Sequence, residues 1–465
     1  MRGRRAWGAA LLAALVFALS AGPATAAEAD CPAPMRCLDV NVPLDRSGTA
    51  PGSIDLPVVV DQGDKPVFLL LAGGPGQGLA GQAGEFGGLF RRLLPNHRFA
   101  ALDQRGTGSI ALRCPSLQRL PLTDLMVPPR RAVRDCGNLL GPDRSFYTTT
   151  DTVEDIEAVR VALGVEKLTI MGVSYGTYVA ERYATAHPDR VERLILDSVV
   201  PQRGVDPFFR ANFKRAGHVL RKTCARRACE TVTGDPVRDL ARLVRSRPFA
   251  GRVPGKRLRL KVDGPAIFDW LTSVSSFQPR TLPRFQGAVT RTLRGDRGAM
   301  LRMGAAARAL SPVSPAESLS WALHAATLCS DMTLPFSISS PFEGRRAAVR
   351  RAVSRIPARS LYPFDRKTAA GNGALTTCAD WPATVVDPPP APTDLPPVPV
   401  LLFAGAFDLS TPLAEARREL ARAPEGELVV LPGGHGQSIF TRCGQRSISK
   451  FMTGKPAAVP CGSRR

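Results

Sequence analysis

Aromatic residues are scarce in this chain and make up 6% of its 465 positions. Surfaces that bind nucleic acid usually combine clustered basic side chains with aromatic rings that stack on bases. The formal net charge is +22, but no run of lysine and arginine is interleaved with aromatic residues. We therefore expect no nucleic-acid partner, and we interpret the positive charge as a source of attraction to an anionic cell envelope.

Long apolar runs are also missing. Near the N-terminus, three arginines precede an apolar stretch at 9–19 that is too short to cross a bilayer. Ala24-Thr25-Ala26 then has the small residues of a cleavage site. We expect residues 1–26 to be a signal peptide. The mature chain is then secreted, either extracellular or associated with the cell envelope, with no membrane span and as a monomer.

No Cys-x-x-Cys pair occurs, which argues against a thiolate metal site. The ten cysteines are even in number, and all lie beyond the expected signal peptide. In an exported protein this predicts disulfides, although the sequence leaves their pairing open. We favour pairs of neighbours along the chain: Cys31–Cys37, Cys114–Cys136, Cys224–Cys229, Cys329–Cys378 and Cys443–Cys461. We expect no metal and no other cofactor.

The stretch at 167–178 organises the rest of the chain. It begins with an apolar run that predicts a buried strand, and a helical pattern follows it. Between the two lies Gly172-x-Ser174-x-Gly176, the pattern of a sharp turn that lifts a serine hydroxyl clear of a sheet. We predict that Ser174 is a nucleophile. The backbone amide of Tyr175, at the start of the helix, is then one donor of an oxyanion hole.

A second glycine-rich loop, Gly73-Gly74-Pro75-Gly76, follows the apolar run Val67–Leu71. Such a loop lets backbone amides approach a ligand closely. It has no Gly-Lys-Ser/Thr ending, and no Gly-x-Gly-x-x-Gly opens a helix there, as a phosphate-binding loop would require. We therefore predict that it completes the oxyanion hole, with Gly74 as the donor.

Asp103 and Arg105 follow the next expected strand, at 99–102. Charged residues at this place can act in catalysis. More often such a pair ties two loops together, and we favour that structural role.

The arrangement of elements indicates the fold class. An antiparallel hairpin is expected within 31–62, and strands then alternate with helices from 67 to 200. This alternation predicts a parallel sheet with right-handed crossovers, hence the α/β class. Helical patterns dominate 201–386, and a proline-rich linker leads back to the sheet. The expected domains are a core at 27–200, a helical cap at 201–386 and the remainder of the core at 387–465.

Histidine is rare, and only one of the five histidines follows a core strand. His435 comes after the expected strand at 427–431, and Asp408 comes after the strand at 398–405. The carboxyl ends of parallel strands meet at one edge of a sheet. A serine nucleophile needs an imidazole base whose other nitrogen has an acceptor. We predict a triad of Ser174, Asp408 and His435.

Weaker alternatives exist for two members of this triad. Asp387 and Asp394 are alternatives for the acid, but both lie in the proline-rich linker. The remaining histidines precede a strand, end a helix or lie in the cap: His97, His187, His218 and His324.

These motifs together resemble the prolyl-aminopeptidase-like serine peptidases of the α/β-hydrolase superfamily. Within them the chain is most similar to the secreted tripeptidyl aminopeptidases of actinobacteria. The resemblance implies the α/β-hydrolase fold, a mostly parallel sheet flanked by helices with a large, mainly helical cap insertion. It also implies the same triad and oxyanion hole. Proline-specific members usually have His where this chain has Ala72 and Trp where it has Tyr175. These differences favour the release of short peptides.

The expected substrate is therefore a peptide with a free N-terminus. Its α-ammonium calls for a carboxylate in the cap, for which Glu317, Asp331 and Asp380 are candidates. An esterase or lipase would share the triad, and a wholly apolar cap would favour it. A non-catalytic protein that binds the cell envelope through its positive charge is a third interpretation, against which an intact triad argues.

Overall fold

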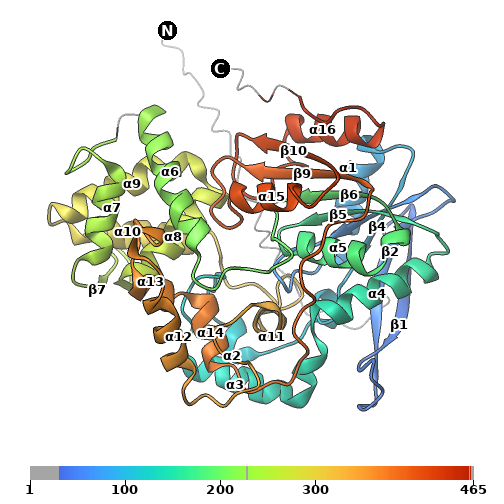
Figure 1. Ribbon diagram of the computed structural model, residues 1–465, viewed down its shortest axis with the longest axis horizontal. Coiled ribbons are helices and arrows are strands. Elements are labelled where there is room, and N and C mark those ends of the chain that lie inside the picture. The colour runs from blue at the N-terminus through green and yellow to red at the C-terminus, as the bar shows by residue number, and fades with distance from the viewer. Residues whose placement is uncertain (1–30, 227–228, 460, 462–465) are drawn as a thin grey trace, which may run out of the picture.

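The computed structural model describes residues 31–226, 229–459 and 461. The expected signal peptide lies outside these residues. The centre of the molecule is an eight-stranded sheet in the order β1-β2-β4-β3-β5-β6-β9-β10 (Figure 1). The strands are β1 (Met35–Pro43), β2 (Ser53–Asp61), β3 (Val67–Leu71), β4 (Arg98–Leu102), β5 (Leu168–Val173), β6 (Val191–Asp197), β9 (Pro399–Gly405) and β10 (Glu425–Leu431).

The pairing of these strands confirms a mostly parallel sheet. β1 pairs antiparallel with β2, and β2 pairs antiparallel with β4. Every other neighbouring pair in this sheet is parallel. β3 is a continuous apolar run that is buried along its whole length, as a central parallel strand must be because helices cover both faces.

Two layers of helices cover the sheet. The apolar faces of α4 (Thr149–Ala162), α5 (Tyr175–Ala186) and α15 (Leu413–Leu420) pack on one side. Those of α1 (Ala83–Leu93) and α16 (Arg442–Met452) pack on the other. Because the parallel strands run in the same direction, their carboxyl ends lie at one edge of the sheet, where the loops that follow them can meet.

A large helical region lies between β6 and β9 in the sequence and beside the sheet in space (Figure 1). Its helices are α6 (Arg210–Arg226), α7 (Pro236–Arg245), α8 (Gly264–Phe277), α9 (Leu282–Leu293), α10 (Arg297–Arg308), α11 (Trp321–Asp331), α12 (Arg345–Ser354), α13 (Arg366–Ala370) and α14 (Gly373–Asp380). The region also contains a short antiparallel hairpin, β7 (Phe249–Arg252) with β8 (Arg259–Val262). Four-residue strands carry too little alternation to be recognised from the sequence, which is why this hairpin was not expected.

A second segment of the chain, outside residues 201–386, also packs with the cap helices. The segment between β4 and α4 forms α2 (Pro115–Gln118) and α3 (Arg130–Leu140). These two helices share an apolar cluster with α11 and α14, at the lower edge of the view in Figure 1. The division of the chain at residues 200 and 387 stays a prediction. The structure adds that α2 and α3 pack with the cap helices.

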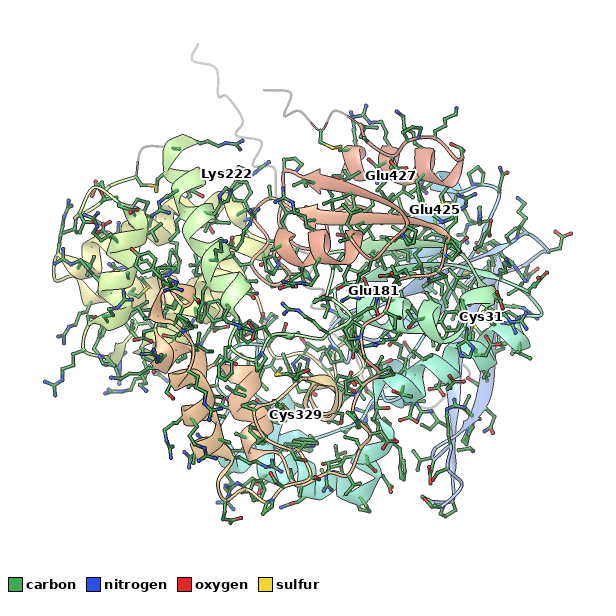
Figure 2. The ribbon with its side chains drawn as sticks, viewed as in Figure 1. Cys31, Glu181, Lys222, Cys329, Glu425 and Glu427 are labelled. Carbon is green, nitrogen blue, oxygen red and sulfur yellow. A yellow bond between two sulfur atoms is a disulfide. The ribbon has the colours of Figure 1, made fainter. Side chains whose placement is uncertain are left out.

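All five neighbouring cysteine pairs form disulfides, as expected. Cys31 and Cys329 mark two of them, far apart in Figure 2. Each bond closes a segment of 5 to 49 residues, so each restricts the unfolded chain locally. In the part of the chain that the structure describes, no helix is both long and apolar enough to span a membrane.

The charges of Asp103 and Arg105 do not pair with each other. Asp103 accepts hydrogen bonds from the amides of Leu79 and Ala80, at 2.7 and 2.9 Å. Arg105 is buried, and its Nε and Nη2 donate to the two carboxylate oxygens of Asp155 in α4, at 2.6 Å each. Asp103 thus joins two loops and Arg105 joins its loop to helix α4, which agrees with the structural role that we favour.

Candidate active site

Ser174 occupies the one-residue turn between β5 and α5. Its φ of 56° and ψ of −123° lie in a region that residues with a side chain rarely adopt. A Cβ at Gly172 would collide with the carbonyl oxygen of Gly176, and one at Gly176 would lie 2.5 Å from the carbonyl oxygen of Leu71. Both glycines are therefore required by the closeness of the backbone. The side chain of Ser174 makes no capping hydrogen bond.

Asp408 and His435 meet beyond the ends of β9 and β10. Asp408 is completely buried, and its Oδ2 lies 2.8 Å from Nδ1 of His435. Thr411 Oγ1 donates to the same oxygen at 2.6 Å. On the other side, Oδ1 accepts from Ser276 Oγ at 3.1 Å and from the amide of Ser410 at 2.8 Å. The carboxylate is thereby held with one oxygen aimed at the imidazole.

The loop that carries His435 is anchored to the turn that carries Ser174. The backbone carbonyl of Asp197, at the end of β6, accepts from the amide of Ser174 at 2.9 Å. Its buried carboxylate accepts from the amide and hydroxyl of Ser438, at 2.8 and 2.6 Å. One residue therefore positions both segments. Among the described residues no hydrogen bond joins Ser174 Oγ to His435, so this third contact of a triad is not formed here.

The charges around His435 favour its protonated form. Burial by itself lowers the pKa of His435, but the charge and hydrogen bond of Asp408 outweigh it. The charges of Asp197 and Asp124 add to this, and the pKa of His435 is raised above its ordinary value. Burial raises the pKa of Asp408, whereas the charge and hydrogen bond of His435 and the hydrogen bonds of Thr411 outweigh burial and lower it. Asp408 thus remains an anion while His435 gains proton affinity.

The loop of Gly73 and Gly74 lies against the nucleophile turn. A Cβ at Gly73 would be 3.0 Å from the Cβ of Ser174, and Gly74 has a φ of +104° that suits glycine. On the other side of Ser174, Tyr175 is the first residue of α5. Its amide is among the first in the helix, which have no acceptor within the helix. Gly73, the neighbour of the predicted donor Gly74, thus lies beside the serine, and the predicted donor Tyr175 follows the serine in the chain.

Cap residues hold this glycine-rich loop in place. The amide of Ser320 donates to the carbonyl of Gly76 at 2.9 Å, and Gln77 forms an isolated antiparallel bridge with Leu319. Nδ1 of His324, in α11, lies 3.1 Å from the carbonyl oxygen of Pro75. From the sequence His324 is only one of several histidines away from the core strands, whereas the structure places it against the glycine-rich loop at Pro75.

The three carboxylates expected to bind the substrate amine are spread apart. Glu317 is exposed and paired with Arg113 at the surface. The buried Asp380 is surrounded by Arg130, Arg134 and Arg346, with its closest contact to Arg346 at 2.5 Å. Both carboxylates therefore already have cationic partners.

Asp331 lies in a different environment. It accepts from Thr149 Oγ1 at 2.5 Å, and the same hydroxyl contacts the hydroxyl of Tyr175 at 2.5 Å. Burial raises the pKa of Asp331 to about 7. At neutral pH this carboxyl is protonated for much of the time, which weakens it as a receptor for a cation.

The alternative acids of the linker lie apart from the base. Asp387 and Asp394 are exposed, and Asp408 is the carboxylate partner of His435. Thr411 and Ser276 support Asp408 directly and were not expected. Thr411 lies only three residues beyond Asp408, so the segment Asp408-Leu409-Ser410-Thr411 held a usable signal. Ser276 comes from α8, far along the chain, and no local pattern identifies it.

Comparison with known proteins agrees with this fold. A family model described as the α/β hydrolase fold matches residues 66–260, and one described as TAP-like protein matches 362–458. Together they cover well over half of the chain. The chain therefore has the α/β-hydrolase fold, and its C-terminal part is similar to the TAP-like proteins. Its named relatives include serine peptidases.

Three curated relatives illustrate the similarity. A tripeptidyl aminopeptidase of Streptomyces lividans is 29% identical over 211 residues, which is 40% of this chain and 39% of the relative. Serine protease Hip1 of Mycobacterium tuberculosis is 32% identical over 157 residues, 30% of each chain. A probable proline iminopeptidase of Streptomyces coelicolor is 33% identical over 132 residues, 28% of this chain and 32% of the relative. The matches thus span about two fifths or less of these relatives.

Proposed function

We propose that this protein is a secreted serine aminopeptidase that releases short peptides or single residues from peptide N-termini. The observation that carries the proposal is the 2.8 Å contact between Asp408 and His435, beside a serine at a strained strand-to-helix turn. No metal or cofactor has a part in this chemistry. The disulfides support export, because such bonds persist in oxidising compartments.

In the proposed reaction His435 accepts the proton of Ser174 as the oxygen attacks the peptide carbonyl. The amides of Tyr175 and Gly74 stabilise the negative oxygen that forms. His435 then protonates the leaving amine, and Asp408 stabilises the imidazolium between these steps. Water hydrolyses the acyl-enzyme by the same route. Catalysis needs Nε2 of His435 to approach Ser174 Oγ when substrate binds, since apo geometry is often looser than the reacting one.

The decisive assay compares tripeptide anilides that have a free or an N-acetylated amine, together with a short-chain ester. An aminopeptidase cleaves the free tripeptide anilide at a much higher kcat/KM than the acetylated one. Equal rates on both peptides would contradict the proposal, and activity on the ester alone would favour an esterase. A fluorophosphonate probe should label the wild type and not Ser174→Ala. A wild type that is not labelled would favour the non-catalytic interpretation.

The pH dependence provides a separate prediction. His435 acts as a base only when it is neutral, and its pKa is raised above the ordinary 6.5. As pH rises through this raised pKa the imidazole loses its proton, so kcat/KM should increase with pH and reach half its maximum above pH 6.5. Initial rates from pH 5 to 9 at constant ionic strength check this, with an independent test of stability at each pH. A midpoint below 6.5 would contradict the assigned role of Asp408.

A further inference from the structure

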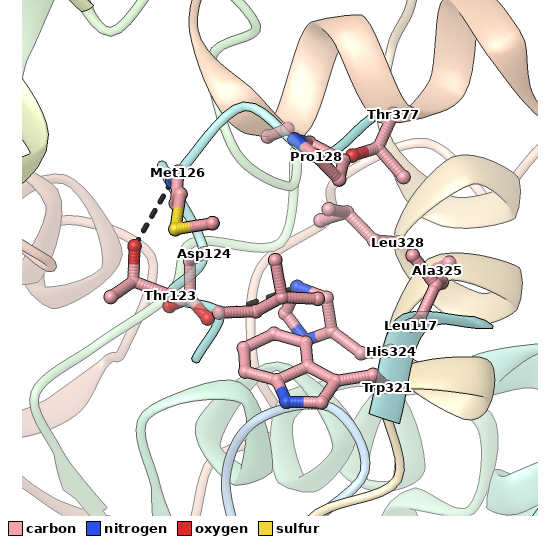
Figure 3. A pocket seen from close by; sticks show the side chains of 12 residues that line it. Leu117, Thr123, Asp124, Met126, Pro128, Trp321, His324, Ala325, Leu328 and Thr377 are labelled. Carbon is pink, nitrogen blue, oxygen red and sulfur yellow. Dashed lines mark hydrogen bonds and ion pairs between the residues drawn. The ribbon is translucent and has the colours of Figure 1, made fainter. Parts of the chain in front are cut away.

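A small hollow opens between the loop after α2 and helix α11. Apolar side chains form most of its wall, including Leu117, Met126 and Trp321. Its polar lining residues are Thr123, Asp124, His324 and Thr377 (Figure 3). The cavity volume is about 20 Å³, which is room for one group the size of a water molecule or an ammonium. Large side chains do not fit.

Asp124 and His324 do not form a hydrogen bond with each other. The carbonyl of Pro75 can only accept, so its 3.1 Å contact requires a proton on Nδ1 of His324. In neutral histidine Nε2 is then an acceptor. It lies 3.7 Å from Oδ1 of Asp124, which also accepts and which is too far for a hydrogen bond. A group with several N–H donors would satisfy both.

The hollow adjoins the proposed catalytic centre. His324 contacts Pro75, the neighbour of the oxyanion donor Gly74. The charge of Asp124 is also among the influences that raise the pKa of His435, so this carboxylate acts on the imidazole. The side chain of Asp124 is 62% exposed and therefore open to an incoming ligand. Thr123 holds the loop in place through its hydrogen bond to Asp269 in α8.

We propose that Asp124 and His324 bind the α-ammonium group of the peptide substrate. The proposal rests on the proposed aminopeptidase function and replaces the three carboxylates expected from the sequence. An α-ammonium has three N–H donors and a positive charge. It can donate to Nε2 of His324 and to the carboxylate of Asp124 at once.

The three carboxylates expected from the sequence already have arginine or hydrogen-bond partners, whereas Asp124 has neither in the part of the chain that the structure describes. Glu317 and Asp380 are already paired with arginines. Asp331 is hydrogen-bonded to Thr149, and its pKa of about 7 leaves it partly neutral. Asp124 makes no closer polar contact than the one with His324 among the described residues. Among the described residues, Asp124 is thus a carboxylate near the Gly73–Gly76 loop whose negative charge is not paired with an arginine.

Binding measured without turnover tests this inference. In the Ser174→Ala background, isothermal titration compares a tripeptide amide that has a free N-terminus with its N-acetylated form. We expect the free peptide to bind more tightly, and Asp124→Asn to reduce this preference by about 10- to 100-fold, as expected for a lost hydrogen bond to a charged group. The acetylated peptide should bind equally to both variants. Glu317→Gln is the matched control, because this exposed carboxylate faces Arg113 instead.

The possible failures can be told apart. If wild-type enzyme prefers free peptides but Asp124→Asn retains the full preference, only this inference is overturned. A permanent ion pair between His324 and Asp124 would overturn it too, because Asp124→Asn would then leave peptide affinity unchanged. If the Ser174→Ala protein binds both peptides equally and the wild type cleaves esters alone, the aminopeptidase function and this inference fail together. In otherwise active enzyme, Asp124→Asn should raise KM for free peptides more than for their N-acetylated forms.

Discussion

Replacing Asp408 with asparagine is expected to lower kcat by about 10⁴-fold, with little change in folding. The reason lies in the donors around the carboxylate. Oδ1 accepts from Ser276 Oγ and from two amides, those of Ser410 and Thr411. The asparagine oxygen must occupy that side, and the amide nitrogen is forced toward Nδ1 of His435. A donor there selects the tautomer that carries its proton on Nε2, which cannot accept the proton of a serine.

Initial rates on a free tripeptide anilide, with circular dichroism and a melting curve for each variant, measure this effect. Asp394→Asn is the matched control, since it makes the same chemical change at an exposed linker position. We expect the control to keep wild-type activity. A comparable loss in both variants, or near-normal kcat in Asp408→Asn, would show that Asp408 does not orient the base.

Replacing Arg105 with methionine should destabilise the fold by about 3–5 kcal/mol, because it leaves a buried carboxylate without its main partner. Arg105 binds both oxygens of Asp155, and its Nη1 also donates to the carbonyl of Phe146 at 2.6 Å. Among the described residues, Asp155 would then keep the single cationic partner Arg46, at 2.5 Å. The change therefore removes the bond between the loop after β4 and helix α4.

Urea unfolding at pH 7 measures this loss as a change in the midpoint. The double variant Arg105→Met/Asp155→Leu should recover part of it, because no unpaired charge is then buried. Arg113→Met removes an arginine from an exposed pair and should change stability by about 0.5 kcal/mol or less. Equal effects of Arg105→Met and Arg113→Met would mean that burial of the Arg105 pair adds nothing to stability.

The parts of this site that lie at the ends of strands could be predicted from the sequence. Ser174, Asp408 and His435 each follow an apolar run within a few residues, and the geometry of a parallel sheet brings such positions to one edge. The contact between Asp408 and His435 could thus be expected from the order of residues alone. The parallel pairing of the core strands follows from the same alternation of strand and helix.

The contacts between the cap and the core could not be predicted from the sequence. Asp124 is a single acidic residue in a loop, and His324 is a single histidine on a helix. Neither has a pattern, and their proximity depends on how α11 packs against the loop after α2. The pairing of Glu317 and Asp380 with arginines could not be predicted for the same reason. A carboxylate is available to a ligand only if no arginine has already paired with it, and the sequence does not say which arginines lie nearby.

The bridge between Gln77 and Leu319 and the hydrogen bond from Ser320 to Gly76 join the segment before α11 to the glycine-rich loop. Any outward swing of the segment before α11 would pull on Gly76 and Pro75, and Gly74 would move with them. Opening of the site to a substrate and displacement of the proposed oxyanion donor Gly74 would then occur in one motion. If the proposed peptidase opens in this way, the Gly74 amide is out of place while the site is open and returns only when the segment before α11 closes again.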